Sequence, residues 1–314
     1  MGSIHLLADG DCPMWQDFDF SAAAAAYGQL TSVLAGFAFI AITLMLNRQH
    51  RREALGRADI AEELVQDRRC IAAFGCAFLG LIAATVLYAA ISAERGCVVT
   101  DGRGASEEVL AGVAFAFALY TLLFAAVQLV SAAALGAHIR FIVAVLTPPI
   151  IVVFVLSSLD DLALSLAGPP QNPLPHRPIE PMWTPSSRSL WDSSQSLLPW
   201  LALAVFVACA VIWWCGRSVR RDDGTPARLM DLAMTCLPYS SLALIMFAVW
   251  QSMSLSTLDP TAHISPRLAW GLVGVSTALV IAQSACLSLE RGEERDHQTA
   301  PTQPSGQGED EGRA

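Results

Sequence analysis

The sequence predicts an all-α protein: a polytopic membrane bundle of seven transmembrane helices, with the N-terminus outside the membrane and the C-terminus in the cytoplasm. Three observations lead to this prediction. The 314 residues are 54% hydrophobic and only 15% charged, with a mean hydropathy of +0.48, which is well on the apolar side for a water-soluble protein. The apolar residues also form seven uncharged blocks, and arginine is shared unequally between the segments that join these blocks.

Each block reaches the length of a membrane span, since about 20 helical residues cross a hydrocarbon core of about 30 Å. Polar and apolar residues do not alternate along the blocks, as they would in the strands of a membrane barrel, so helices are expected. The predicted spans are residues 24–46, 70–92, 109–135, 141–158, 197–215, 232–254 and 268–289.

These spans divide the chain into three parts. Residues 1–23 form an outer N-terminal segment, and residues 24–289 form the transmembrane domain. The tail at 290–314 is rich in Glu, Gly, Gln, Ser and Pro and has almost no apolar residue, a composition that predicts disorder. The outer connection at 159–196 is rich in proline and then in serine, which is typical of a stiff linker.

Arginine predicts the orientation, because successive connections alternate between the two sides of the membrane. The set made of 47–69, 136–140, 216–231 and the tail holds 14 arginines, whereas the opposite set holds five. The positive-inside rule therefore places the first set in the cytoplasm. The opposite set carries 13 acidic residues, so the outer surface is expected to be strongly acidic.

Composition also excludes or disfavours several classes of protein. The chain has no lysine, which excludes a retinal protein of the microbial rhodopsin type, where the retinal is held as a Schiff base on a lysine amine. The predicted spans lack Asp, Glu, Arg and His, which disfavours proton-coupled transport and intramembrane hydrolysis. The six histidines fall in loops or tails and show no HxxxH spacing. We therefore expect no catalytic residue, no metal and no cofactor.

The eight cysteines fall into two groups. Cys12 and Cys97 lie on the predicted outer side, where disulfides persist, and we expect them to be joined. Closing a loop of this length contributes on the order of 4 kcal/mol in the chain-entropy model. The remaining six lie in the inner halves of spans, where we expect them to pack as small apolar side chains: Cys70, Cys76, Cys209, Cys215, Cys236 and Cys286.

Polar residues on four spans share one depth. Gln128 and Gln283 each lie about seven residues, or roughly 10 Å, from the inner face. At comparable depth the fourth span has Thr147-Pro148-Pro149 and the sixth has Pro238-Tyr239-Ser240-Ser241. Because proline removes a backbone donor, both helices are expected to kink there. The arrangement predicts a polar pocket that opens inward, lined by Gln128, Gln283, Tyr239, Ser240 and Thr147. The alternative is that the two glutamines only form hydrogen bonds between helices.

These observations favour a non-enzymatic membrane protein that binds a small neutral or amphipathic molecule, or a partner helix, through this pocket. The alternative is a permease or channel subunit, which gains weight if the similar segments 33–39 and 109–115 reflect a duplication. An intramembrane enzyme ranks third, and a purely structural protein stays open. The expected partners are the lipid bilayer and either another membrane protein or a second copy, with no nucleic acid. The arginine-only, alanine-rich composition suggests a bacterial plasma membrane.

Overall fold

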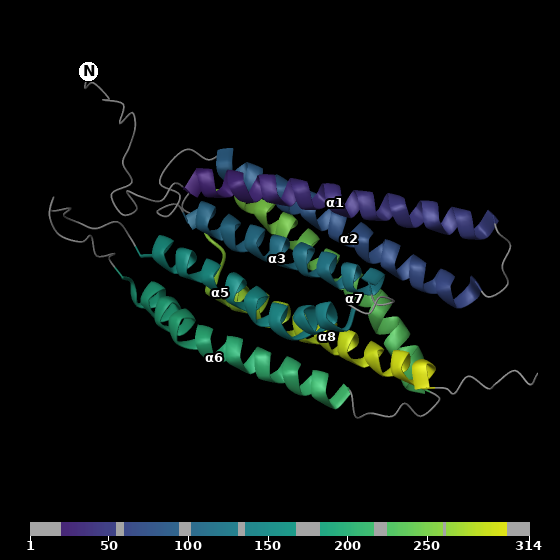
Figure 1. The fold of residues 1–314 in the computed structure, drawn as a ribbon. Coiled ribbons are helices and arrows are strands. Elements are labelled where there is room, and N and C mark those ends of the chain that lie inside the picture. Colours follow the sequence, from purple (N-terminus) through teal and green to yellow (C-terminus); the bar gives the residue numbers. More distant parts are fainter. Residues whose placement is uncertain are drawn as a thin grey trace, which may run out of the picture.

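The computed structural model describes residues 20–54, 60–93, 102–130, 136–167, 183–216, 225–259 and 262–299. All regular secondary structure in these ranges is helical (Figure 1). Seven helical segments there are long and apolar enough to cross a membrane, which confirms the predicted fold class and the number of spans.

Six spans are single helices and the fourth is composite. The single helices are α1 (Phe20–Ala54), α2 (Ile60–Ala93), α3 (Gly102–Val130), α6 (Pro185–Gly216), α7 (Thr225–Ser256) and α8 (Pro266–Thr299). The fourth span consists of α4 (Gly136–Phe141), a π-helical turn η2 (Ile142–Leu146) and α5 (Thr147–Ser165).

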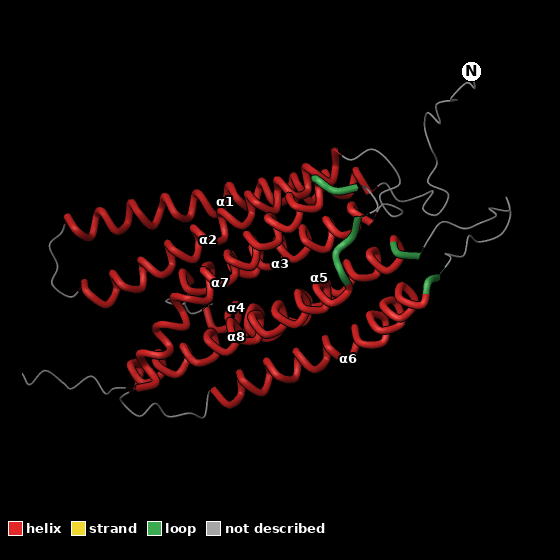
Figure 2. Tube along the Cα trace, turned by 180° about the vertical axis from the view of Figure 1, so that it is seen from behind, coloured by secondary structure: helices red, strands yellow, loops and turns green. Residues whose placement is uncertain are grey.

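Helix α3 forms the centre of the bundle. Of the residues in its apolar stretch, 78% are buried by the other helices, against 22% for α1 and 17% for α6. Helices α2, α5, α7 and α8 all contact α3. On one side α1 packs mainly on α2, and on the other side α6 packs on α5 and α8 (Figures 1 and 2).

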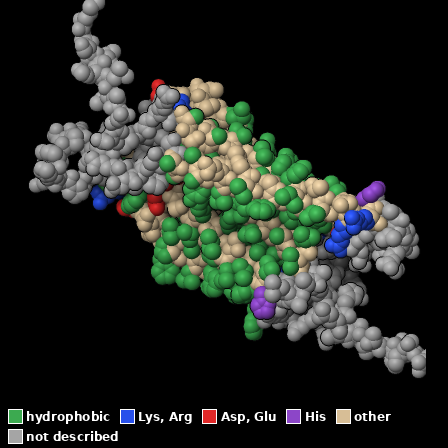
Figure 3. All heavy atoms as spheres, turned by 45° about the horizontal axis from the view of Figure 1, so that its top comes forward, with side chains coloured by type: hydrophobic (Ala, Val, Ile, Leu, Met, Phe, Trp, Pro, Cys, Tyr) green, Lys and Arg blue, Asp and Glu red, His purple; other side chains and the backbone are tan. Residues whose placement is uncertain are grey.

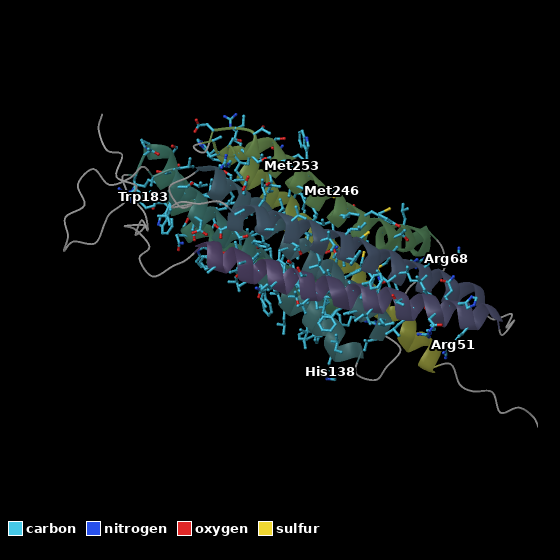
Figure 4. The ribbon with its side chains drawn as sticks, turned by 90° about the horizontal axis from the view of Figure 1, so that it is seen from above. Arg51, Arg68, His138, Trp183, Met246 and Met253 are labelled. Atoms are coloured by element: carbon cyan, nitrogen blue, oxygen red, sulfur yellow. The ribbon has the colours of Figure 1, made fainter. Side chains whose placement is uncertain are left out.

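The sides of the bundle, between its two ends, are apolar. Large hydrophobic side chains such as Phe37, Leu44 and Trp214 are exposed there, as expected for a surface that meets lipid. Figure 3 shows hydrophobic side chains along this side and the charged ones gathered toward the two ends. Arg51 and Arg68 lie toward one end and Trp183 lies at the other (Figure 4). The charged side chains of the described residues thus lie mainly at the ends of the bundle and not along its apolar side.

The helices are longer than the apolar blocks, and this corrects one expectation. Helix α3 begins at Gly102 and α5 ends at Ser165, so both contain acidic residues that the sequence assigned to loops. Arg140, in α4, is only 1% exposed. The predicted spans themselves contain no charged residue, but the helices continue beyond them into acidic residues and Arg140, which a hydropathy window leaves in the connections.

The start of α6 also differs from the expected linker. Thr184 precedes Pro185, and proline is favoured at the first position of a helix. The Ser187 N–H donates to Thr184 Oγ1 at 3.1 Å, and the Thr184 N–H donates to Ser187 Oγ at 2.9 Å. This reciprocal cap has the form of a capping box with serine at the third position. The serine-rich segment is thus helical, and α8 likewise continues to Thr299, into the segment predicted to be disordered.

Glycine allows close contacts between helices at some positions and not at others. In α8 a Cβ at Gly271 or Gly274 would meet no described atom within 4 Å. A Cβ at Gly80 of α2 would instead lie 2.7 Å from Ile245 Cδ1 and 3.1 Å from Ala118 Cβ. Gly80 is therefore where α2 meets both α7 and α3.

We predict that Gly80→Val destabilises the bundle by about 1–3 kcal/mol, the usual cost of overpacking. The matched control is Gly75→Val on the same helix, where a Cβ would meet no described atom within 4 Å. The measurement is the fraction of folded protein after heating in detergent. Equal losses for the two variants would show that the contact at Gly80 is not limiting.

Candidate functional site

The π-helical turn η2 lies directly before two adjacent prolines. In a π-helix each carbonyl accepts from the N–H five residues later. The Thr147 N–H accordingly donates to the Ile142 carbonyl, and Thr147 Oγ1 donates to the same oxygen at 3.2 Å. The next two carbonyls, of Val143 and Ala144, would need the N–H groups of Pro148 and Pro149, which proline does not have. Both carbonyls therefore depend on donors from outside their own helix.

Side chains of two neighbouring helices supply these donors. The Tyr120 hydroxyl of α3 donates to the Val143 carbonyl at 3.3 Å. The Ser284 hydroxyl of α8 donates to the Ala144 carbonyl at 2.5 Å. Tyr120 and Ser284 are fully buried, so water does not compete for these bonds. Because an unpaired buried carbonyl costs about 1–3 kcal/mol, the two hydroxyls stabilise the composite fourth span.

Gln283 lies next to Ser284 and extends the polar contacts to α7. Its amide Nε2 donates to Ser241 Oγ at 2.8 Å, and Ser241 Oγ donates to the Leu237 carbonyl at 3.2 Å. Gln283 is 0% exposed, and its Oε1 has no hydrogen-bond partner among the described residues. We call Tyr120, Ser241, Gln283 and Ser284, with the two carbonyls of η2, the buried polar layer.

The predicted pocket residues are only partly brought together. Gln283 belongs to the buried polar layer, and Gln128 is buried on α3. Tyr239 is 52% exposed, and Ser240 is also exposed and donates to the Cys236 carbonyl of its own helix at 3.0 Å. Consecutive helical residues are rotated by about 100°, so Ser241 rather than Ser240 faces the interior.

The predicted kinks have different outcomes. Pro148 and Pro149 lie directly after the π-helical turn, and Thr147 bonds within the same turn. Pro238 lies inside α7 without ending that helix. Sequence reasoning missed Tyr120 and Ser284, and it placed Ser241 in the polar layer without choosing it for the pocket. The two prolines alone indicate that carbonyls of the fourth span need hydrogen-bond donors from other helices. Nothing in the sequence indicates which helix supplies these donors.

The cysteines near this layer act as small side chains. Cys209 of α6 is fully buried close to Ser284, and Cys70 of α2 donates to the Ala125 carbonyl at 3.5 Å. No disulfide joins any of the six cysteines that the structure describes. Within the same ranges no group of three or more His, Cys, Asp or Glu is placed to hold a metal. Cys12 and Cys97 lie outside the described residues, so their disulfide stays a prediction.

A second polar cluster lies near the start of α3 and the end of α5, away from the buried polar layer. The carboxyl groups of Glu108 on α3 and Asp161 on α5 lie close enough to interact with each other. Glu108 Oε2 is buried and has no hydrogen-bond partner in the described part of the chain. The neighbouring Asp160 accepts from Ser194 Oγ and from Gln195 Nε2 of α6, both at 2.6 Å. These carboxyl groups face other helices, which explains their place in apolar spans.

No protein-family model, curated protein or solved structure matches this chain.

We predict that Asp160→Ala loosens the first turns of α6, because Ser194 and Gln195 lose their shared acceptor. The expected loss of stability is about 1–2 kcal/mol, near the lower end for bonds to a charged group, since the Gln195 side chain is exposed. Intrinsic tryptophan fluorescence reports the change, because the ring centroids of Trp183 and Trp191 in this segment lie 5.5 Å apart.

The matched control for this prediction is Asp192→Ala in the same turns, where the carboxylate makes only an exposed pair with Arg188 at 4.0 Å. Exposed pairs contribute little to stability. A similar effect from both variants would argue against Asp160 as the anchor of α6.

Proposed function

We propose that this chain is a non-enzymatic integral membrane protein that binds a small neutral or amphipathic molecule at the buried polar layer. The observation that supports this most directly is Gln283, which is fully buried with its Oε1 unpaired among the described residues. A carbonyl oxygen only accepts hydrogen bonds, so the molecule that suits it carries an O–H or N–H group. Such a donor would offset the cost of burying this oxygen.

The chemistry of the layer favours binding over catalysis. Its side chains are two serine hydroxyls, one phenol and one amide, and its defined members include no carboxylate and no imidazole. General acid–base catalysis needs a group that titrates near the working pH, which these side chains do not offer. Neutral hydrogen-bonding groups suit an uncharged ligand.

We further propose that the N-terminus is outside and the C-terminus inside, so that the layer lies toward the cytoplasmic face of a plasma membrane. The 14 arginines on one set of connections, against five on the other, support this orientation. The bilayer is then the main partner, and the exposed apolar sides of α1 and α6 leave room for another membrane protein or a second copy.

A permease or channel subunit is the second candidate, and the Glu108–Asp161 pair favours it. Carboxyl groups buried in spanning helices commonly mark ion or proton pathways. The sequence disfavoured a proton-coupled transporter because the predicted spans lack titratable residues, and the Glu108–Asp161 pair supplies two such residues at the ends of spanning helices. Swelling of proteoliposomes in iso-osmotic glycerol separates the candidates, since a permease for neutral solutes speeds swelling and a binding protein does not.

The orientation is tested with a membrane-impermeant maleimide on intact cells. We predict modification of Ser186→Cys, exposed at the start of α6, and protection of His50→Cys, exposed near the end of α1. Peptide mapping by mass spectrometry separates these sites from the native cysteines. Modification of His50→Cys with protection of Ser186→Cys would reverse the orientation.

The binding site is tested by thermal unfolding in detergent with glycerol, acetamide and 1-octanol as probes. A ligand at 100 times its Kd stabilises by about 2.7 kcal/mol, which corresponds to a rise in Tm of about 5 °C or more. We predict that Gln283→Leu abolishes this rise for the effective probe. The variant should fold normally, because hydrogen bonds between membrane helices contribute only about 0.6 kcal/mol on average.

The matched control is Gln29→Leu, the same change at an exposed position of α1. General solvent effects of a probe act equally on the wild type and on both variants. If no probe raises the Tm of the wild type more than that of Gln283→Leu, the proposed site is refuted and Gln283 only links α7 to α8.

A further inference from the structure

We infer that η2 is a hinge in the fourth span that rewinds between a π-helical and an α-helical register, and that the Tyr120 hydroxyl selects the π register. This inference does not depend on a ligand at Gln283. It rests on a comparison of the backbone carbonyls that each register leaves without a donor.

The π register leaves one more carbonyl without a backbone donor than the α register does. In the observed π register Pro148 and Pro149 deprive the carbonyls of Val143 and Ala144, five residues before them. The Val145 carbonyl lacks a donor there too, because α5 begins at Thr147 and the Ile150 N–H donates to its N-cap residue Leu146. In the α register only the carbonyls of Ala144 and Val145, four residues before the prolines, lack a donor. The backbone itself therefore favours the α register by one carbonyl, that of Val143, and a side-chain donor is needed to stabilise the π register.

The two hydroxyls have different effects on this choice. Ser284 Oγ donates to the Ala144 carbonyl, which lacks a backbone donor in both registers. Tyr120 donates to the Val143 carbonyl, which lacks a donor only in the π register, because in the α register the Thr147 N–H reaches it. Ser284 thus stabilises both forms, whereas Tyr120 stabilises one of them.

Rewinding changes which side chains are covered. A π-helical turn holds one more residue than the α-helical turn that would replace it. On rewinding with α5 held in place, the extra residue shifts the chain before Thr147 by one position toward the N-terminus. Each of these residues then takes the place of the residue that precedes it in the sequence and turns by about 100° about the helix axis. Val143, 3% exposed, would take the exposed place of Ile142. Phe141, 40% exposed and packed 5.6 Å from Trp213, would take the buried place of Arg140. Arg140 would leave its present site at the end of the span.

The hinge is tested with the cysteine reporters Val143→Cys and Phe141→Cys in the full chain in membranes. Modification by methyl methanethiosulfonate is followed by peptide mapping, which resolves the reporters from native cysteines. With Tyr120 present, Val143→Cys should be protected and Phe141→Cys modified. We predict that Tyr120→Phe raises modification of Val143→Cys about five-fold, the effect of one neutral hydrogen bond on the equilibrium, and lowers that of Phe141→Cys.

The matched control is Ser284→Ala, which should lower the Tm without changing either reporter. A second pair of variants is made in the Tyr120→Phe background. Pro148→Ala supplies an N–H that reaches the Val143 carbonyl in the π register and should return protection to Val143→Cys. Pro149→Ala restores a donor to the Val145 carbonyl in either register and should leave both reporters as they are in Tyr120→Phe. Protection of Val143→Cys in Tyr120→Phe, or equal exposure in Ser284→Ala, would overturn the hinge.

Discussion

Two adjacent prolines in the middle of a buried span impose the constraint on which the rest of this bundle depends. Pro148 and Pro149 follow η2 and remove two donors from a backbone that packs against other helices. In a membrane interior water does not supply the missing donors, so neighbouring helices must. The hydroxyls of Tyr120 and Ser284 do so, and they join the fourth span to α3 and α8.

This requirement explains why polar side chains gather in an otherwise apolar core. The carbonyl of Ala144 holds Ser284, and the adjacent Gln283 then faces Ser241 of α7. Two adjacent residues of α8 thus make separate hydrogen bonds to η2 and to α7. One acceptor, Gln283 Oε1, is left without a partner among the described residues. The buried polar layer thus supplies donors to the free carbonyls of η2 and also contains the proposed binding site. It contacts η2, the turn for which we infer two helical registers.

The centre of the bundle is organised around α3, which bears a polar anchor at each end. Tyr120 lies in its second half, and Glu108 lies in its first turns beside Asp161 of α5. Small residues let neighbouring helices approach α3 closely, as Gly80 of α2 does at Ala118. Polar groups in an apolar surrounding find partners in few arrangements, so these anchors restrict how the helices can be placed relative to one another.

Composition and block length alone determined the fold class and the number of spans, because lipid demands about 20 apolar residues in each helix whatever its neighbours are. The prolines 148 and 149 likewise marked a break in the fourth span, since the missing N–H is a property of the residue itself. The sequence also singled out Gln283. It missed the acidic ends of α3 and α5, because side chains that face other helices do not follow hydropathy.

Only the tertiary structure decided which side chains donate hydrogen bonds to the carbonyls that the prolines leave without a backbone donor. Tyr120 and Ser284 are separated from η2 by many residues in the sequence, and their roles depend on the side of α3 and α8 that faces the fourth span. The choice of Ser241 over Tyr239 and Ser240 is likewise a matter of helix rotation, which a bundle with polar residues on several faces does not reveal in its sequence. The sequence determined how many helices there are and where they weaken, and packing decided their rotation, because rotation is set by contacts between helices.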